Sequence, residues 1–572
     1  MYSNKENVNI LTALLVAHGV KRAVVSPGSR NAPIVHNLYE CPHISCYPVT
    51  DERSAGFFAI GLIQMLQEPV AVCVTSGTAL LNLYPAVAEA RYQHLPLIVI
   101  SADRQQQWID QLDGQTLPQT SALGSFVRRA VTIAEPSSGE QHWYVNRLVN
   151  EALLAAVRDD NCCPVHINVP LGEPLFCFDV PTLPAERKIS RYRPSADCDL
   201  LPVALVDGLA AARKPMIVFG QTSPNDFSAN TSDFLFSHVI VLHESLSPFP
   251  HVSHFDEVLA RIMSSEVDNN VADDMLPDFI IHVGDTIVSK RLRQFLRRAA
   301  GPTYDHSIPE RHKRAITWRI SASGDVEDTF MSLGGIVVGD AETLLQSLSS
   351  KLRNATMNGM AYRRKWLGLL TEARRHARDF MPPYSQMAAV KAFEYQLSQM
   401  PREHLVCHYA NSSAIRLANI YAEHHVWCNR GVNGIEGSLS TAAGASVVHP
   451  TVCVIGDLSF FYDQNALWNT NITGNLRILL LNNFGGAIFH SLPGLSQSSA
   501  AQQLVAAQHN TNAEGICSQN NILYRKVQCA AELDEAMRWL LFTQSSRPVL
   551  LEVITQADAD TKALTDYIQS LK

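Results

Sequence analysis

Short runs of aliphatic and β-branched residues recur along this chain, and each is followed by a small or polar turn and then by a helical pattern. In the N-terminal third, such runs lie at Arg22–Val25, Val70–Val74 and Leu97–Ser101, with a helical stretch at Ala79–Tyr92. Strand, helix and strand in about thirty residues form a βαβ unit, which requires a parallel sheet. The pattern therefore predicts an α/β fold.

The same pattern occurs twice more in the 572 residues. The further runs are Pro215–Gly220, His238–Leu242, Phe279–Gly284, Thr451–Ile455, Arg477–Leu481 and Pro548–Val553. A proline-rich stretch at about 175–200 reads as a linker, and a charged helical stretch at about 340–380 bridges the second and third segments. We expect three doubly wound parallel-sheet domains, at residues 1–180, 200–350 and 381–572.

Charge and cysteine content exclude several classes of protein. The formal net charge is −8, so the chain has no global electrostatic reason to bind nucleic acid or an anionic membrane. The 12 cysteines include no CxxC pair, which argues against a disulfide scaffold or a zinc site. No apolar window approaches about 18 residues, so no membrane span is expected. We expect a cytoplasmic protein.

Two polar dipeptides follow neighbouring strands of the C-terminal segment. Gly456-Asp457 ends one strand, and Asn482-Asn483 ends the next. Both loops would lie at the same edge of a parallel sheet, where carboxylate and amide oxygens suit Mg²⁺. The alternative is that both dipeptides are ordinary turn residues, but their spacing and context favour a ligand site. The chain has neither a GxGxxG fingerprint nor a Walker A loop.

The GD…NN arrangement resembles the diphosphate and metal motif of the thiamine diphosphate (ThDP) enzymes, which have three α/β domains. The resemblance implies ThDP and Mg²⁺ as cofactors, with Mn²⁺ as an alternative ion, and Asp457, Asn483 and the Gly485 carbonyl as metal ligands. The family often has a third Asn where Phe484 stands. The other cofactor contacts implied in this region are Gly456, Leu458, Ser459, Gly486, Ala487 and Ile488.

Glu52 begins a predicted helix that continues with Ala55-Gly56. Judged alone, it is an acidic residue in a first turn, stabilised by the helix dipole. The resemblance implies instead that Glu52 hydrogen-bonds the aminopyrimidine ring of ThDP and so promotes formation of the reactive ylide. In this family the pyrimidine domain of one subunit faces the diphosphate domain of another. The resemblance thus implies a homodimer or homotetramer with active sites at the subunit interface, and an inactive monomer.

Longer motifs resemble one branch of these enzymes, the 2-succinyl-5-enolpyruvyl-6-hydroxy-3-cyclohexene-1-carboxylate (SEPHCHC) synthases of menaquinone biosynthesis. They include Ser26–Ile34, Asp51–Leu62, Thr75–Ala90 and Asn429–Gly444, and the resemblance spans essentially the whole chain. That branch consists of transferases that decarboxylate 2-oxoglutarate and add the succinyl carbanion to isochorismate in a Stetter-like 1,4-addition.

The resemblance also implies a set of substrate contacts, because both substrates are acids that call for Arg and Lys. By motif position, the residues that bind the acids are Ser29, Arg30, Arg104, Lys290, Ser412, Arg416 and Arg430. Gln115 would contact a ring hydroxyl or the cofactor, and Ile435 would bend the cofactor. Ile488, Phe489 and Leu492 would form an apolar wall over its thiazolium ring. The chain has Asp113-Gly114-Gln115 where the family often has Ala-Asn-Gln.

Two other readings stay open at this point. The first is another ThDP enzyme, of the acetohydroxyacid synthase or 2-oxoacid decarboxylase type, which would share Glu52, Asp457 and Asn483. An arginine-rich pocket distinguishes the two, because a pyruvate site needs fewer cations. The second is a ThDP-like fold that has lost catalysis. It predicts loss of Glu52 or of the GD…NN pair, and both are present.

Overall fold

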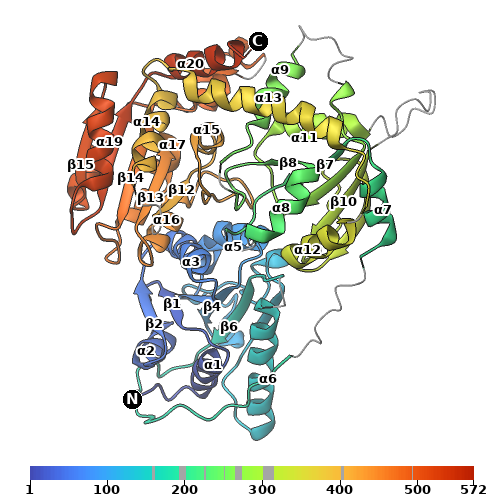
Figure 1. Cartoon of the computed structure of the whole chain (residues 1–572). Coiled ribbons are helices and arrows are strands. Elements are labelled where there is room, and N and C mark those ends of the chain that lie inside the picture. Colours follow the sequence, from blue (N-terminus) through green and yellow to red (C-terminus); the bar gives the residue numbers. More distant parts are fainter. Residues whose placement is uncertain are drawn as a thin grey trace.

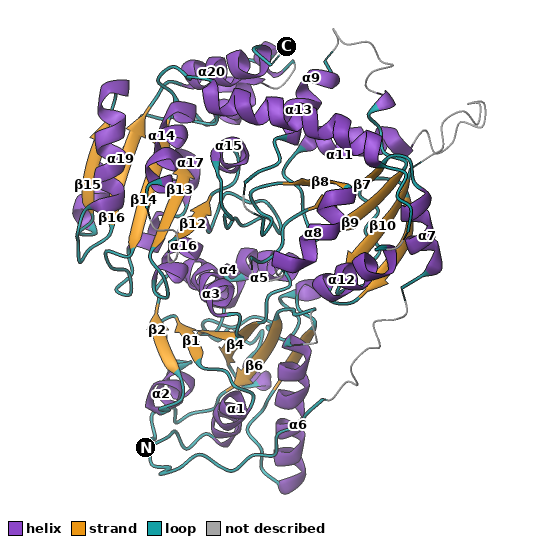
Figure 2. Cartoon of the chain, in the orientation of Figure 1, coloured by secondary structure: helices purple, strands orange, loops and turns teal. Residues whose placement is uncertain are grey.

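Three parallel sheets follow one another along the chain, with helices packed around each of them (Figures 1 and 2). The computed structural model describes residues 1–157, 161–191, 201–224, 227, 229–249, 251–264, 273–300, 315–353, 355–400, 405–491 and 494–571. The predicted α/β fold class is confirmed. The predicted domain boundaries remain predictions, and we name the units by their strands.

The N-terminal unit contains a six-stranded sheet in the order β2-β1-β3-β4-β6-β5. Its strands are β1 (Arg22–Val25), β2 (Ser45–Pro48), β3 (Val70–Val74), β4 (Leu97–Asp103), β5 (Arg129–Thr132) and β6 (Val165–Pro170). Its helices are α1 (Glu6–Ala17), α2 (Ala32–Glu40), α3 (Glu52–Leu66), α4 (Thr78–Asn82), α5 (Tyr84–Tyr92) and α6 (Gly139–Ala156). Every residue of β3 and β4 is buried, as expected for a parallel strand covered on both faces.

The central unit contains a five-stranded sheet in the order β11-β10-β9-β7-β8. Its strands are β7 (Pro215–Phe219), β8 (Ile240–His243), β9 (Phe279–Val283), β10 (Ile316–Ser321) and β11 (Leu333–Val338). Its helices are α7 (Val203–Ala211), α8 (Ala229–His238), α9 (Phe255–Ile262), α11 (Lys290–Ala300), α12 (Ala341–Leu352) and α13 (Met360–Asp379). The bridging helix expected at about 340–380 is present as α12 and α13. Figure 1 shows α13 running from the central unit towards the C-terminal unit.

The C-terminal unit contains a five-stranded sheet in the order β12-β13-β14-β16-β15. Its strands are β12 (Val406–Tyr409), β13 (Thr451–Gly456), β14 (Leu476–Asn482), β15 (Leu523–Val527) and β16 (Val549–Ile554). Its helices are α14 (Gln386–Ser398), α15 (Ser413–Tyr421), α16 (Ser438–Ser446), α17 (Asp457–Tyr462), α18 (Glu514–Gln519), α19 (Leu533–Phe542) and α20 (Ala557–Gln569). In the described part of the chain, no helix combines the length and apolar character needed to cross a membrane.

Helices α3 and α16 join the N-terminal unit to the C-terminal unit through a close backbone contact. A Cβ atom added at Gly61 would lie 2.1 Å from the carbonyl oxygen of Thr441, and one at Gly444 would lie 2.1 Å from that of Phe58. Glycine is required at both positions because the two backbones touch. The contact fixes α3, which begins at Glu52, against the unit that carries Asp457.

Candidate active site

The carboxyl ends of β13 and β14 bring the two predicted metal-binding dipeptides together. Gly456 pairs with Leu481 on the neighbouring strand, so Asp457 at the start of α17 lies beside the turn after β14. The Oδ2 atom of Asp457 accepts hydrogen bonds from the backbone N–H groups of Asn483, at 3.2 Å, and Gly485, at 2.9 Å. The structure therefore places all three predicted metal ligands in one cluster.

The side-chain oxygen of Asn483 is buried and has no hydrogen-bond partner among the described residues. The amide nitrogen of the same side chain donates to Asp560 at 2.7 Å, which fixes the side chain. The Asp457 residue is only 4% exposed. A buried acceptor without a donor is costly, and buried oxygen atoms of this kind are the ligands that Mg²⁺ prefers. The donor set fits a divalent cation.

Two neighbours of this cluster were missed in the sequence analysis. His509 places its Nε2 atom 3.3 Å from the Asp457 carboxylate, and its Nδ1 accepts from the Thr511 N–H at 3.0 Å. Burial raises the pKa of the Asp560 carboxyl, which also accepts from the Gln386 N–H at 2.7 Å. Both residues are far from the GD…NN motif in sequence, so no local pattern could have identified them.

The turn after β14 is tight, and its backbone conformation accounts for the Asn that the family often has at the position of Phe484. Phe484 has a φ of +65°, a left-handed conformation that asparagine adopts more readily than phenylalanine. A Cβ atom at Gly485 would lie 2.9 Å from the carbonyl oxygen of Ala506. The Gly485 carbonyl accepts from the Ala487 N–H at 3.2 Å, which leaves it a second lone pair. The turn thus brings backbone groups close to Asp457.

Glu52 is the first residue of α3, and the side chain of Asp51 caps this helix by accepting from the Ser54 N–H at 3.1 Å. The half-buried Glu52 carboxylate accepts a hydrogen bond from the Asn82 amide at 3.2 Å. Asp51 also accepts from Asn465 of the C-terminal unit at 2.6 Å. These contacts hold Glu52 near the interface between the N-terminal and C-terminal units. The predicted meeting of Glu52 and Asp457 across subunits stays a prediction.

The predicted arginines of the N-terminal unit lie together, and each is paired with a carboxylate. Arg30 is buried, donates to the Leu171 carbonyl at 3.2 Å and lies 3.1 Å from Glu173. Arg104 lies 3.3 Å from Asp113. Burial lowers the pKa of the Arg30 guanidinium and the charge of Arg104 lowers it further, while Glu173 and Asp113 raise it. Ser29, which precedes Arg30, and Gln115, two residues after Asp113, are both exposed.

A second group of cations lies where the central and C-terminal units meet. Arg430 is buried and donates to the Asn411 side chain at 3.0 Å. Burial lowers the pKa of Arg416, the Asp256 carboxylate raises it, and the neighbouring charges of Arg430, Arg291 and Arg293 lower it further. The predicted Arg416 and Arg430 are thus brought together. Lys290 is exposed at the start of α11.

The start of α11 supplies two cations that the sequence analysis missed, Arg291 and Arg293. Arg291 pairs with Asp256 at 2.5 Å. Glu244 accepts from the Val288 and Ser289 N–H groups, both at 2.7 Å, and so fixes the turn before α11. Burial raises the pKa of Glu244 to about 7. The sequence run Ser289-Lys-Arg-Leu-Arg293 carries the signal, because basic residues gather at the start of a helix that follows a strand.

The remaining predicted contacts lie around the turn after β14 and the loop before α16. Ile435 is 40% exposed, and the Ser459 hydroxyl donates to its carbonyl oxygen. Ser412 precedes α15 with a φ of +72°. The other predicted cofactor and wall residues that the structure describes, Leu458, Gly486, Ala487, Ile488 and Phe489, are half-buried. Leu492 lies outside the described residues.

Comparison with protein families and characterised proteins agrees with this geometry. Residues 6–123 match the thiamine pyrophosphate enzyme N-terminal TPP binding domain, and residues 409–553 match the C-terminal TPP binding domain. The chain is 44% identical to a SEPHCHC synthase of Bacteroides fragilis over 586 residues, which covers 100% of both chains. It is 42% identical to that of Bacteroides thetaiotaomicron and 33% identical to that of Christiangramia forsetii, again over 100% of both chains.

A crystal structure from Mycobacterium smegmatis, described as a thiamin diphosphate-dependent enzyme, has the same fold. It superposes with a TM-score of 0.68 at 17% identity and covers 96% of this chain and 99% of its own. At that identity, the match shows the fold alone.

Proposed function

This chain belongs to the SEPHCHC synthases, a family of ThDP enzymes, and we propose that it transfers the succinyl unit of 2-oxoglutarate to isochorismate with loss of carbon dioxide. The product is 2-succinyl-5-enolpyruvyl-6-hydroxy-3-cyclohexene-1-carboxylate, an intermediate of menaquinone biosynthesis. The observation that carries this function is identity of 41–44% over the full chain with synthases of this name. The cytoplasm is its proposed location.

The cluster at the end of β13 and β14 is the proposed site of the diphosphate and its metal. Asp457, Asn483 and the Gly485 carbonyl would bind Mg²⁺, for which Mn²⁺ is an alternative. The support is the buried side-chain oxygen of Asn483, which has no hydrogen-bond partner in the described part of the chain and lies beside the Asp457 carboxylate. When bound, ThDP supplies the carbanion-stabilising chemistry, and the protein supplies orientation and charge. The residues that would line the cofactor are Gln115, Ser412, Ile435, Gly456, Leu458, Ser459, Gly486, Ala487 and Ile488.

Glu52 is the proposed catalytic residue, and its carboxyl group would share a proton with the pyrimidine ring nitrogen. Asp51 caps the helix that Glu52 begins, and the Asn82 amide donates to the Glu52 carboxylate. Both contacts fix the position of Glu52, as proton sharing requires. We propose that the enzyme is a homodimer or homotetramer in which Glu52 of one subunit serves the Asp457 cluster of another.

The two groups of cations are the proposed binding sites for the substrate acids. Guanidinium groups bind carboxylates through paired hydrogen bonds, and they keep their charge at all relevant pH values. The residues proposed to bind substrate are Ser29, Arg30, Arg104, Gln115, Lys290, Ser412, Arg416 and Arg430, with Ile488, Phe489 and Leu492 as the apolar wall. The apolar wall would exclude water from the reacting carbon.

Loss of isochorismate absorbance tests the function. We expect consumption only when the enzyme, 2-oxoglutarate, ThDP and Mg²⁺ are all present. Carbon dioxide release from pyruvate without isochorismate consumption would refute the proposed substrates and indicate a related ThDP decarboxylase or synthase.

A further inference from the structure

The two arginines of the N-terminal unit already hold carboxylates, although these belong to the chain itself. Arg30 lies 3.1 Å from Glu173, and Arg104 lies 3.3 Å from Asp113. Arg416 differs, because no acidic side chain of the described residues forms a direct ion pair with it, and its acidic neighbour Asp256, which raises its pKa, lies beyond ion-pair distance. The two arginines in the N-terminal half of the proposed substrate site therefore have direct carboxylate partners, which Arg416 lacks.

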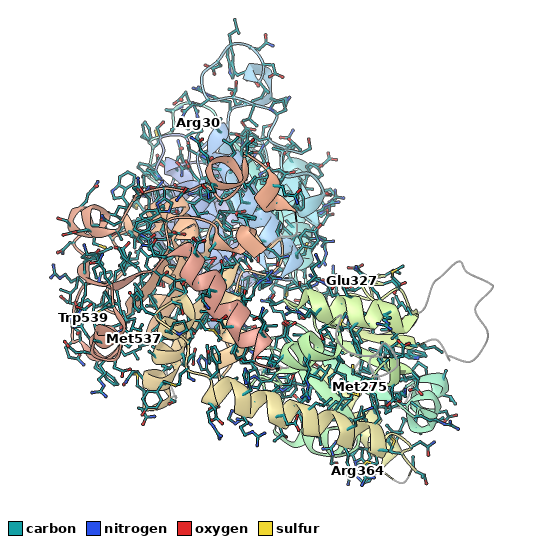
Figure 3. The ribbon with its side chains drawn as sticks, turned by 90° about the horizontal axis from the view of Figure 1, so that it is seen from above. Arg30, Met275, Glu327, Arg364, Met537 and Trp539 are labelled. Atoms are coloured by element: carbon teal, nitrogen blue, oxygen red, sulfur yellow. The ribbon has the colours of Figure 1, made fainter. Side chains whose placement is uncertain are left out.

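The side chain of Arg30 and the backbone of Arg104 are held firmly in this cluster. Arg30 is only 7% exposed, and its contact with the Leu171 carbonyl anchors the guanidinium from the side of β6. The backbone of Arg104 follows β4 directly, and its N–H donates to the buried Asp103 at 2.8 Å. Asp103 in turn accepts from the buried Asn168 at 2.8 Å. Figure 3 shows Arg30 in the N-terminal unit, at the end of the molecule opposite Arg364 of α13.

The two carboxylates are held loosely by comparison. The Glu173 side chain is 65% exposed, and that of Asp113 is 34% exposed. Asp113 lies in a loop in which Asp110, Leu112 and Gln115 all have positive φ values, a conformation that costs non-glycine residues of order 1 kcal/mol. Because this conformation is strained, the loop loses little stability when it rearranges. The Asp113 carboxylate can therefore move into water.

We infer that Asp113 and Glu173 are internal counterions of Arg104 and Arg30, which a substrate carboxylate must displace, and that they thereby set the affinity for the acid. This inference rests on the proposed function, because it requires the two arginines to bind substrate. Two adjacent guanidinium groups at a partly buried site need counterions when no substrate is present. An incoming carboxylate offers the same oxygen atoms, so it can take over the arginines as the chain's own carboxylates move into solvent.

Substitution of Asp113 should lower the KM of an acid substrate, a change in the direction opposite to that expected from misfolding. Asp113→Asn removes the competing charge, so the KM of at least one of the two acids should fall about two- to fivefold, the range expected for a partly exposed ion pair. The kcat should not change, because displacement precedes the chemistry. The double variant with Glu173→Gln should lower KM further. Asp110→Asn is the matched control, since Asp110 is exposed in the same loop and pairs with no described cation.

The measurement uses the enzyme with ThDP and Mg²⁺, with KM determined for 2-oxoglutarate and isochorismate and Kd for isochorismate by calorimetry. An unchanged or raised KM in Asp113→Asn, equal to that of Asp110→Asn, would overturn the inference but leave the proposed function standing. A wild-type enzyme that neither turns over nor binds isochorismate would overturn both.

Discussion

Glu89 of α5 holds the loop that carries Arg430, and its replacement should loosen that loop in a measurable way. One carboxylate oxygen accepts from the Gly431 N–H and the other from the Val432 N–H, both at 2.7 Å. Glu89 is 2% exposed, so water cannot replace either bond, and burial raises the pKa of its carboxyl. The side chain thus fastens the C-terminal unit's Arg430 loop to the N-terminal unit.

In Glu89→Gln, one acceptor becomes an NH₂ donor that faces a backbone N–H. A buried donor left without an acceptor at this site costs about 2–3 kcal/mol. This cost lowers the free energy of local opening of the loop, so amide hydrogen exchange at residues 431–432 should become roughly 30- to 150-fold faster. Because Arg430 then loses its fixed position, the KM of an acid substrate should rise while the affinity for ThDP is retained.

Glu394→Gln is the matched control for this prediction. Glu394 is also a buried carboxylate, 7% exposed, but its partners are Tyr409 and His424 and not the Arg430 loop. We expect this variant to leave exchange at residues 431–432 and the KM values unchanged. Unaltered exchange in Glu89→Gln, or the same change in both variants, would refute the role assigned to Glu89.

Three further predictions concern the proposed catalytic group, the substrate site and a buried carboxyl. Glu52→Gln should retain ThDP binding, measured by calorimetry, and lose most of its turnover. Full activity in this variant would refute the proton-sharing role of Glu52. Arg416→Ala should raise the KM of an acid substrate about tenfold or more, the loss of a charge-assisted contact, without weakening ThDP binding; weaker cofactor binding would mean that the site is misassigned. Burial raises the pKa of Asp463 to about 6 from its ordinary 3.8, so the folded state binds more protons between those values and this group lowers stability as the pH rises through them. Between pH 4 and pH 7, the wild type should therefore lose about 2 kcal/mol of unfolding free energy relative to Asp463→Asn, as measured by urea unfolding, and a constant difference would contradict the assignment.

The strands and the Asp457 cluster were predictable because both depend on short-range patterns. Val70–Val74 and residues 452–455 are buried and apolar throughout, so they stand out in the sequence. Asp457 and Asn483 follow adjacent parallel strands, and the geometry of such a sheet brings them together whatever lies between them.

The counterions and the supporting groups were not predictable, because they depend on contacts between distant segments. Glu89 contacts Gly431 across the interface between two units, and Glu173, which follows β6, contacts Arg30, which follows β1. His509 reaches Asp457 from a loop without a regular pattern. None of these residues differs locally from an ordinary surface acid or turn residue, so only the fold identifies them.

The proposed reaction transfers a succinyl group from 2-oxoglutarate to isochorismate. The direct test supplies 2-oxoglutarate labelled with carbon-13 at the 2-oxo carbon, with isochorismate, ThDP and Mg²⁺, and analyses the products by NMR and mass spectrometry. We expect unlabelled carbon dioxide and a labelled ketone carbon bonded to the cyclohexene ring. Label found only in a released aldehyde, with isochorismate unchanged, would contradict the proposed transfer.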